Sequence, residues 1–260
     1  MDKIAAATRR RVAARKAFRS EAETEEAAYS RAGGSSGQFE SAISVPDLSF
    51  ICELKRASPS KGMISTDFPY IEIAQEYEKA GAAAVSVLTE PDFFMGSDDY
   101  LRDVAKTVSI PALRKDFTVD AYQIYEAKLL GAAAVLLIAA LLDEKTLASF
   151  IETARKLGMS ALVEAHDERQ IEAALRGGAR IVGVNNRDLG TFSVDLGLSL
   201  RLRSRVPDNV LFVAESGITG ADDVKALSEA GVDAALIGEA VMRAPDRTAF
   251  LRTLRRHNAH

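Results

Sequence analysis

Four stretches of the chain repeat one pattern of apolar and polar positions. In each of them a helix-like segment runs into a glycine and then into a short apolar run. The four stretches are GAAAVSVLTE from Gly81, GAAAVLLIAA from Gly131, GARIVGVNNR from Gly178 and GVDAALIGEA from Gly231. The glycines recur about every 50 residues, as in an internal repeat. Each unit predicts a helix, a glycine at its carboxyl-terminal cap, and a buried strand.

Four further apolar runs lie between the repeats and bring the predicted strands to eight. They are SFICELK at 49–55, IPALRK at 110–115, SALVE at 160–164 and NVLFVAE at 209–215. The eight strands are expected to end near positions 55, 89, 115, 138, 164, 185, 215 and 238. Strands that alternate with helices in this way predict an α/β fold, a (β/α)8 TIM barrel. An open doubly wound sheet would normally carry a G-x-G-x-x-G turn after its first strand, and the sequence has none there.

The first 48 residues lie outside the predicted barrel and form an N-terminal helical extension. Residues 1–20 carry seven Lys or Arg side chains and one acidic side chain, a balance that a transit peptide also has. Because four glutamates follow between Glu21 and Glu26, and the segment is not rich in serine, we favour a basic amphipathic helix that lies on the domain. The polar stretch at 30–38 predicts a connection within the extension. We expect one structural domain, with the extension at 1–48 and the catalytic barrel at 49–260.

Polar side chains interrupt the apolar strands near their carboxyl ends, where barrels of this kind place their sites. Glu53 and Lys55 are two residues apart in one strand and therefore face the same way, whereas Cys52 faces the other side. The same end of the barrel is expected to collect Glu53, Lys55, Lys115, Glu164, Asn185, Arg187, Glu215, Ser216, Gly238 and Glu239.

A solvated barrel rim is the alternative explanation for charged residues at strand ends. It would account for Arg114, Asp116 or Asp188. It accounts poorly for Glu53 and Glu164, because each ends an apolar run and must point inward. Lysines and carboxylates that converge in a partly dry cavity shift one another's pKa values, as acid–base catalysis requires.

Small residues follow the seventh and eighth predicted strands, in ESGI and IGEA. They allow backbone N–H groups to approach an anion, and this position is the usual phosphate site of the architecture. Ser216, Gly217, Gly238 and Glu239 would form the phosphate cup. Either segment alone is a weak signal, since glycines also end strands for structural reasons.

Charge, cysteine and histidine counts and the length of the apolar runs argue against several classes of protein. The chain has 260 residues, a net charge of −4 and a pI near 5.6, which argues against a general nucleic-acid binder. One cysteine excludes an internal disulfide and fits a cytoplasmic protein. The longest apolar run, Gly131 to Leu142, is too short to span a membrane. His166 is expected to begin a helix, and with two other histidines, both in the C-terminal tail, a histidine metal site is not expected.

Seven stretches at the predicted strand ends form a recognisable series. They are ELKRASPSKG, LTEPDFFMGS, LRKDF, LVEAHDE, GVNNRDLGTFSVDL, AESGI and LIGEAVMR. In this order they resemble the indole-3-glycerol-phosphate synthase family of tryptophan biosynthesis. The resemblance implies a carboxy-lyase that closes the indole ring of 1-(2-carboxyphenylamino)-1-deoxyribulose 5-phosphate, with loss of carbon dioxide and water. It also implies no metal and no organic cofactor, and it places the N-terminal extension over the barrel mouth.

The resemblance further assigns catalytic roles. Lys115 is similar to the general acid that protonates the ketone during ring closure, and Glu164 to the carboxylate that handles protons in the later dehydration. Lys55 would hold the substrate carboxylate or phosphate and assist proton transfer. Glu53 would orient the lysines and sugar hydroxyls, with Asn185 beside it. A desolvated lysine beside another cation is expected to be a strengthened acid.

The remaining candidates complete the expected site. Glu215 joins the catalytic group from the end of strand seven. The expected contacts of the substrate carboxylate and sugar phosphate are Ser58, Arg187, Ser216, Gly217, Gly238 and Glu239. The expected apolar wall, which would favour decarboxylation, consists of Phe94, Phe117 and Leu136.

Two other readings remain open from the sequence. One is a related phosphate-binding barrel such as phosphoribosylanthranilate isomerase, which lacks the Glu-x-Lys of strand one together with the lysine of strand three. The other is a noncatalytic barrel, which would need only ESGI and LIGE and would tolerate loss of Lys55, Lys115 and Glu164. We expect a monomer that acts on a small phosphorylated substrate, without nucleic-acid or membrane partners.

Overall fold

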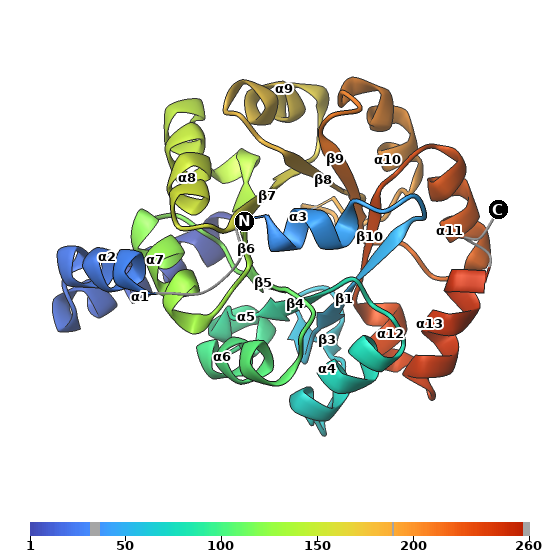
Figure 1. Cartoon of the computed structure of the whole chain (residues 1–260), viewed down its shortest axis with the longest axis horizontal. Coiled ribbons are helices and arrows are strands. Elements are labelled where there is room, and N and C mark those ends of the chain that lie inside the picture. Colours follow the sequence, from blue (N-terminus) through green and yellow to red (C-terminus); the bar gives the residue numbers. More distant parts are fainter. Residues whose placement is uncertain (32–36, 189, 257–260) are drawn as a thin grey trace.

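Eight parallel strands close into a barrel in the computed structural model, which describes residues 1–31, 37–188 and 190–256 (Figure 1). The strands are β1 (Ser49–Leu54), β4 (Ala84–Leu88), β5 (Ala112–Lys115), β6 (Ala134–Ile138), β7 (Ser160–Ala165), β8 (Ile181–Asn185), β9 (Leu211–Glu215) and β10 (Ala234–Ile237). Strand β1 pairs with β4 on one side and with β10 on the other, which closes the ring. The predicted TIM barrel is confirmed, and each strand ends within one residue of the expected position.

Helices surround the barrel between successive strands (Figure 1). They are α4 (Tyr70–Lys79), α6 (Asp98–Thr107), α7 (Ala121–Leu130), α8 (Glu144–Lys156), α9 (Glu168–Arg176), α10 (Gly197–Leu202), α11 (Ala221–Glu229) and α13 (Arg247–Arg256). The shorter elements are α5 (Pro91–Phe94), α12 (Glu239–Arg243), a hairpin of β2 (Ala57–Ser58) and β3 (Gly62–Met63), and the 3-10 turns η1 (Ala139–Leu141) and η2 (Arg203–Arg205). The four repeated glycines all have positive φ angles, between 73° and 94°, so the repeat marks the left-handed turns that lead from helix to strand.

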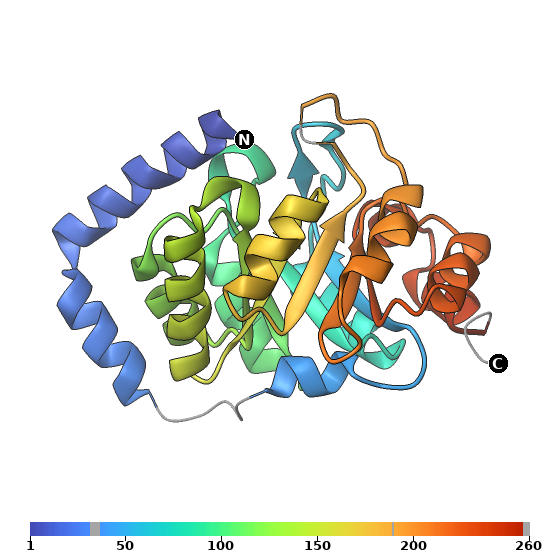
Figure 2. The same cartoon turned by 90° about the horizontal axis from the view of Figure 1, so that it is seen from above.

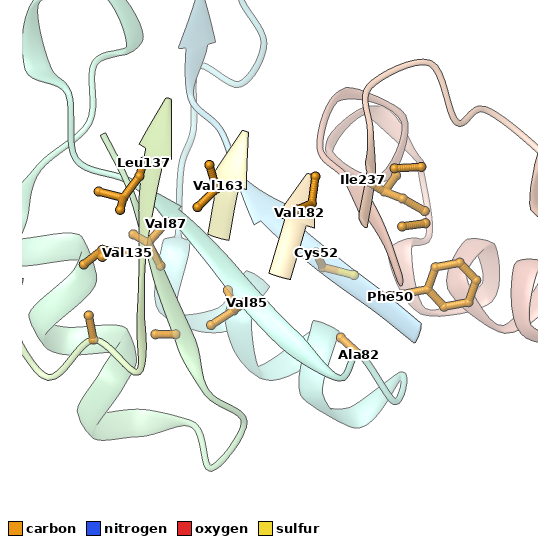
Figure 3. Packing of buried hydrophobic residues seen from close by; sticks show 14 of the residues in the cluster. Phe50, Cys52, Ala82, Val85, Val87, Val135, Leu137, Val163, Val182 and Ile237 are labelled. Carbon is orange, nitrogen blue, oxygen red and sulfur yellow. The ribbon is translucent and has the colours of Figure 1, made fainter. Parts of the chain in front are cut away.

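Alternate strand residues pack on opposite sides of the barrel wall. Phe50 and Cys52 point outward and belong to the cluster of buried residues between the strands and the helices, which also contains Val85 of β4 and Val182 of β8 (Figure 3). Ile51 instead belongs to a separate cluster inside the barrel. The prediction that Cys52 faces away from the polar residues of its strand is therefore confirmed, and burial raises the pKa of its thiol, which makes it a packing residue.

The N-terminal extension consists of α1 (Asp2–Phe18), α2 (Glu21–Ser30) and α3 (Gln38–Ile43). Helices α1 and α2 follow one flank of the barrel, and α3 lies at the end opposite Met1 (Figure 2). Phe39 and Ile43 of α3 are fully buried among the residues inside the barrel, and Glu40 contacts Ser160 and Arg180, which lie at the starts of β7 and β8. Helix α3 thus closes the amino-terminal end of the barrel.

The expected position of the extension over the mouth holds only for its beginning. Met1 and Ile4 line the cavity at the carboxyl-terminal end of the strands, whereas α3 lies at the other end. A six-residue amphipathic helix carries no sequence signal for which end of a barrel it covers. The predicted connection at 30–38 falls mostly on residues 32–36, which lie outside the described residues.

The basic segment at the N-terminus forms a helix docked on acidic groups of the barrel. Arg11 pairs with Glu90, Arg15 pairs with Glu126, and Lys16 lies 2.8 Å from a carboxylate oxygen of α7's cap residue, Asp120. Each such pair contributes little to stability by itself, but together they fix the helix on this face. None of the helices in the described part of the chain is both long and apolar enough to cross a bilayer.

Candidate active site

A cavity of about 900 Å³ opens where the barrel strands end. Its floor is formed by the last residues of several strands, among them Lys115, Ile138, Asn185 and Glu215. Every residue that the sequence predicted for the site lines this cavity: Glu53, Lys55, Ser58, Phe94, Lys115, Phe117, Leu136, Glu164, Asn185, Arg187, Glu215, Ser216, Gly217, Gly238 and Glu239. The structure brings all of them together, while their individual roles remain predictions.

Lys115 lies at the centre of the polar groups. Its ammonium nitrogen is 3.0 Å from Oε2 of Glu164 and 2.8 Å from Oε2 of Glu215. Burial lowers the pKa of Lys115, but the carboxylates of Glu164, Glu215 and Glu53 outweigh burial and raise it above its ordinary value. The expectation that a second cation would strengthen Lys115 as an acid is wrong for the ligand-free site, because its immediate neighbours are carboxylates.

The two carboxylates beside Lys115 differ in protonation. Burial raises the pKa of Glu164, yet Lys115, His166 and a hydrogen bond from Asn185 lower it by more, so Glu164 is held ionised. Burial raises the pKa of Glu215 to about 7, since Lys115 offsets only part of the effect and the charge of Glu164 adds to it. One ammonium group therefore cannot hold both buried carboxylates fully charged, and Glu215 is the one that takes up a proton near neutral pH.

Glu53 and Lys55 form the second ion pair of the floor, as their spacing in the strand predicted. Glu53 is 1% exposed, pairs directly with the ammonium of Lys55, and accepts a 3.4 Å hydrogen bond from the hydroxyl of Ser86. A Cβ atom on Gly238 would come within 2.6 Å of Oε1 of Glu53 and 3.2 Å of the Lys55 nitrogen. Gly238 was expected for phosphate binding, and the structure adds that a side chain there would displace this ion pair.

Asn185 fixes the orientation of the central carboxylate. Its side-chain oxygen accepts a 3.0 Å hydrogen bond from the backbone N–H of Arg187. That contact leaves the amide nitrogen to donate to Glu164. Asn185 therefore holds the Glu164 carboxylate in place through this hydrogen bond.

One wall of the cavity is apolar. The rings of Phe94 and Phe117 lie 6.1 Å apart between centroids, and Leu136 and Ile138 continue the wall below them. Phe94 comes from the short helix α5, and Glu90 caps that helix by accepting hydrogen bonds from its first N–H groups. A flat aromatic ring between these side chains would stand over the lysines and carboxylates of the floor.

The opposite wall is rich in backbone N–H groups and cations. Ser216 and Gly217 have φ angles of 68° and 83°, so two consecutive residues adopt the left-handed conformation after β9. Such a turn directs successive N–H groups toward an anion. The carboxylate of Glu239 lies 3.3 Å from Arg243, 3.5 Å from Lys61 and 3.9 Å from Arg187.

Sequence reasoning missed Lys61, Arg243 and His166. Lys61 lies in the β2–β3 hairpin and Arg243 at the end of α12, and both line the cavity although neither ends a barrel strand. His166 precedes Asp167, the cap of α9, and its Nε2 atom lies 3.7 Å from Oε1 of Glu164. The signal that could have found His166 is its spacing of two residues from Glu164. No group of three or more His, Cys, Asp and Glu side chains within the described ranges is placed to hold a metal ion.

A family model and two curated relatives carry the same family description. The family model described as indole-3-glycerol phosphate synthase matches residues 1–254. The indole-3-glycerol phosphate synthase of Ruminiclostridium cellulolyticum is 56% identical over 255 residues, which cover 98% of each chain. The enzyme of the same name from Endomicrobium trichonymphae is 52% identical over 98% of this chain and 99% of its own.

Solved structures with the same architecture are more distant in sequence. A crystal structure of 3-hexulose-6-phosphate synthase superimposes with a TM-score of 0.66 at 17% identity and covers 82% of this chain and 100% of that one. A thiamine phosphate pyrophosphorylase from Pyrococcus furiosus gives a TM-score of 0.60 at 17% identity, over 82% of this chain and 95% of that one. At such low identity the likeness supports the barrel fold alone.

Proposed function

The chain belongs to the indole-3-glycerol phosphate synthase family and has that activity in tryptophan biosynthesis, and on this basis we propose how its residues divide the reaction. The substrate is a phosphorylated small molecule, and the enzyme is a carboxy-lyase. The observation that carries the proposal is the ammonium group of Lys115 between Glu164 and Glu215, on the floor of a cavity with one apolar and one cationic wall.

The two walls select the two ends of the substrate. The phosphate occupies the cup made by Ser216, Gly217 and the backbone near Gly238, where Lys61 and Arg243 supply charge. The aromatic ring stacks along Phe94 and Phe117, and its carboxylate meets Ser58 and Arg187. The reacting ketone carbon then lies above Lys115.

Ring closure uses Lys115 as the proton donor. The ring carbon that bears the carboxylate attacks the ketone carbon, and the ketone oxygen takes a proton from the Lys115 ammonium. The raised pKa of Lys115 keeps this group protonated in the resting enzyme. A bound substrate that neutralises or displaces the neighbouring carboxylates would lower the pKa of Lys115 again and so ease proton transfer to the ketone oxygen. Lys55, which is paired with Glu53 at the end of β1, stabilises the developing oxygen charge.

Loss of carbon dioxide and of water complete the reaction. The apolar wall around Phe117 and Leu136 weakens solvation of the leaving carboxylate and so favours its loss. Glu164, held ionised in the resting enzyme, then removes a proton from the neighbouring ring carbon, and the Lys55 ammonium gives a proton to the hydroxyl, which departs as water. We also propose that the chain acts as a cytoplasmic monomer, organised as an extension at 1–48 and a catalytic barrel at 49–260.

The test follows indole fluorescence when the purified protein meets the carboxyphenylamino-deoxyribulose phosphate. Lys115→Met should lower kcat by a factor of about 10² to 10⁴, the usual contribution of a general acid. Lys225→Met is the matched control, because the Lys225 side chain is 65% exposed on α11 and pairs, among the described residues, with Glu229 alone. If Lys115→Met retained full turnover, the acid role would pass to Lys55.

A further inference from the structure

His166 is a buried titratable residue that the proposed chemistry does not use. Its side chain is 17% exposed, and both ring nitrogens are buried without a hydrogen-bond partner among the described residues. The ring lies behind Glu164, with Nε2 3.7 Å from Oε1, while Oε2 of the same carboxylate accepts from Lys115. His166 does not line the cavity, so it touches the site only through Glu164.

The overall reaction takes up one proton from solvent. The substrate enters with an ionised carboxylate, which leaves as neutral carbon dioxide. The ketone oxygen gains a proton from Lys115 at ring closure. In the dehydration, one proton goes to the departing hydroxyl and one comes off the ring carbon, so that step is balanced. Lys115 is thus left one proton short after every turnover, a balance that rests on the proposed function above.

The buried groups lie on the cavity floor, so a bound substrate would stand between them and the cavity mouth. Glu164 is 3% exposed and Glu215 is 1% exposed, and both face the cavity floor. A proton that entered through the mouth would have to pass the bound substrate. His166 lies on the other side of Glu164, between β7 and α9, and its side chain reaches the surface.

We propose that His166 is the proton-transfer residue that returns a proton from solvent to Glu164 and Lys115. Because both ring nitrogens are buried, the exposed part of the side chain consists of carbon atoms. Rotation of the ring about χ2 exchanges the positions of ring carbons and nitrogens and so brings a nitrogen to the surface. The imidazole takes a proton from solvent in one orientation and gives it to Oε1 of Glu164 in the other. Rotation of the carboxyl group then presents that proton to the Lys115 amine.

Two acidic side chains are near His166. Glu164 of β7 is the nearest, with Lys115 behind it. Asp188, in the segment after β8, is the second acidic neighbour. Its pKa is lowered mainly by hydrogen bonds from Thr191 and Gly190, and the charge of His166 adds to this effect. The groups that face His166 from β7 and from the segment after β8 are therefore acidic, which suits a residue that carries a proton toward Glu164.

The test compares kcat in the wild type, His166→Asn and His166→Ala between about pH 6.5 and about pH 8.5. Asparagine preserves a polar side chain but cannot titrate. We expect kcat of both variants to fall about ten-fold at the higher pH, where protons are scarce, and less at the lower pH. Added imidazole should restore much of the His166→Ala loss and leave the wild type unchanged. Wild-type kcat in His166→Asn across this range, or a loss that imidazole does not restore, would overturn the proposal.

A second measurement does not depend on turnover. The imidazole NMR signals of His166 can be assigned by their absence in His166→Asn, since the chain has only three histidines. The midpoint of their titration should drop by about one pH unit in Glu164→Gln and stay unchanged in Glu172→Gln, a control on exposed α9. Equal midpoints in wild type and Glu164→Gln would contradict the coupling. Lys115→Met in the fluorescence assay separately tests the proposed function.

Discussion

The ammonium nitrogen of Lys115 lies 2.8 Å from Oε2 of Glu215, and yet the pKa of this glutamate is raised to about 7. An ion pair normally lowers the pKa of a carboxyl group. Here burial and the charge of Glu164 outweigh the lysine, because one ammonium serves two carboxylates in a dry cavity. Glu215 therefore exchanges a proton near neutral pH, where an ordinary glutamate would be fully ionised.

Replacing Glu215 by glutamine should change how stability depends on pH. A carboxyl group whose pKa is higher in the folded protein binds its proton more tightly there than in the unfolded chain. The free energy of unfolding then falls as pH rises from the ordinary glutamate pKa of 4.5 through about 7. Glutamine does not titrate. Between about pH 5 and about pH 8, the free energy of unfolding of the wild type should therefore fall by on the order of 2 kcal/mol more than that of Glu215→Gln. Urea unfolding at both pH values measures it, and parallel behaviour of the two proteins would contradict the raised pKa.

Glu164→Gln should separate decarboxylation from dehydration. The amide keeps the shape of the side chain but cannot accept a proton, so only the last step loses its base. In a single turnover we expect carbon dioxide release to continue, while indole fluorescence appears about 10² to 10⁴ times more slowly. The exposed substitution Glu172→Gln on α9 is the control. Equal slowing of both signals would place Glu164 in ring closure instead.

Gly238→Ala should damage the active site more than the fold. The new Cβ atom would lie 2.6 Å from Oε1 of the buried Glu53, the same oxygen that pairs with Lys55, so the carboxylate must shift. We expect a loss of stability of about 1–3 kcal/mol, typical of overpacking, and a larger relative fall in kcat because the Glu53–Lys55 pair shifts. Gly220→Ala is the control, since nothing lies within 4 Å of a Cβ atom there. If both variants behaved alike, the packing argument would fail.

Glu239→Gln should tighten the binding of inorganic phosphate. The Glu239 carboxylate lies among Lys61, Arg187 and Arg243 in the cup that is proposed to take the substrate phosphate. Removing its negative charge leaves these cations unneutralised, so we expect the inhibition constant of phosphate to fall about three- to ten-fold. The measurement is competitive inhibition by phosphate at constant ionic strength. A higher inhibition constant in the variant would show that the carboxylate supports the cup.

The barrel and the strand-end residues of its site could be predicted because both follow from local pattern, whereas Ser58 and Phe117 were found through the family resemblance. Each glycine that caps a helix marks the strand that follows, and alternation within a strand tells which side Glu53 and Lys55 face. Lys61 and Arg243 could not be found this way, since they reach the cavity from a hairpin and a short helix rather than from strand ends. The raised pKa of Glu215 depends on three side chains from separate strands, and no single stretch of sequence contains that information.

Helix α3 has a consequence for how the chain is made. Its buried residues Phe39 and Ile43 pack inside the barrel, and Glu40 contacts Ser160, which the ribosome adds 120 residues later. Strand β1 likewise pairs with β10, the last strand of the ring. An apolar plug and an unpaired strand edge are therefore exposed through almost the whole of translation. We expect the nascent chain to depend on chaperones until its final strand emerges.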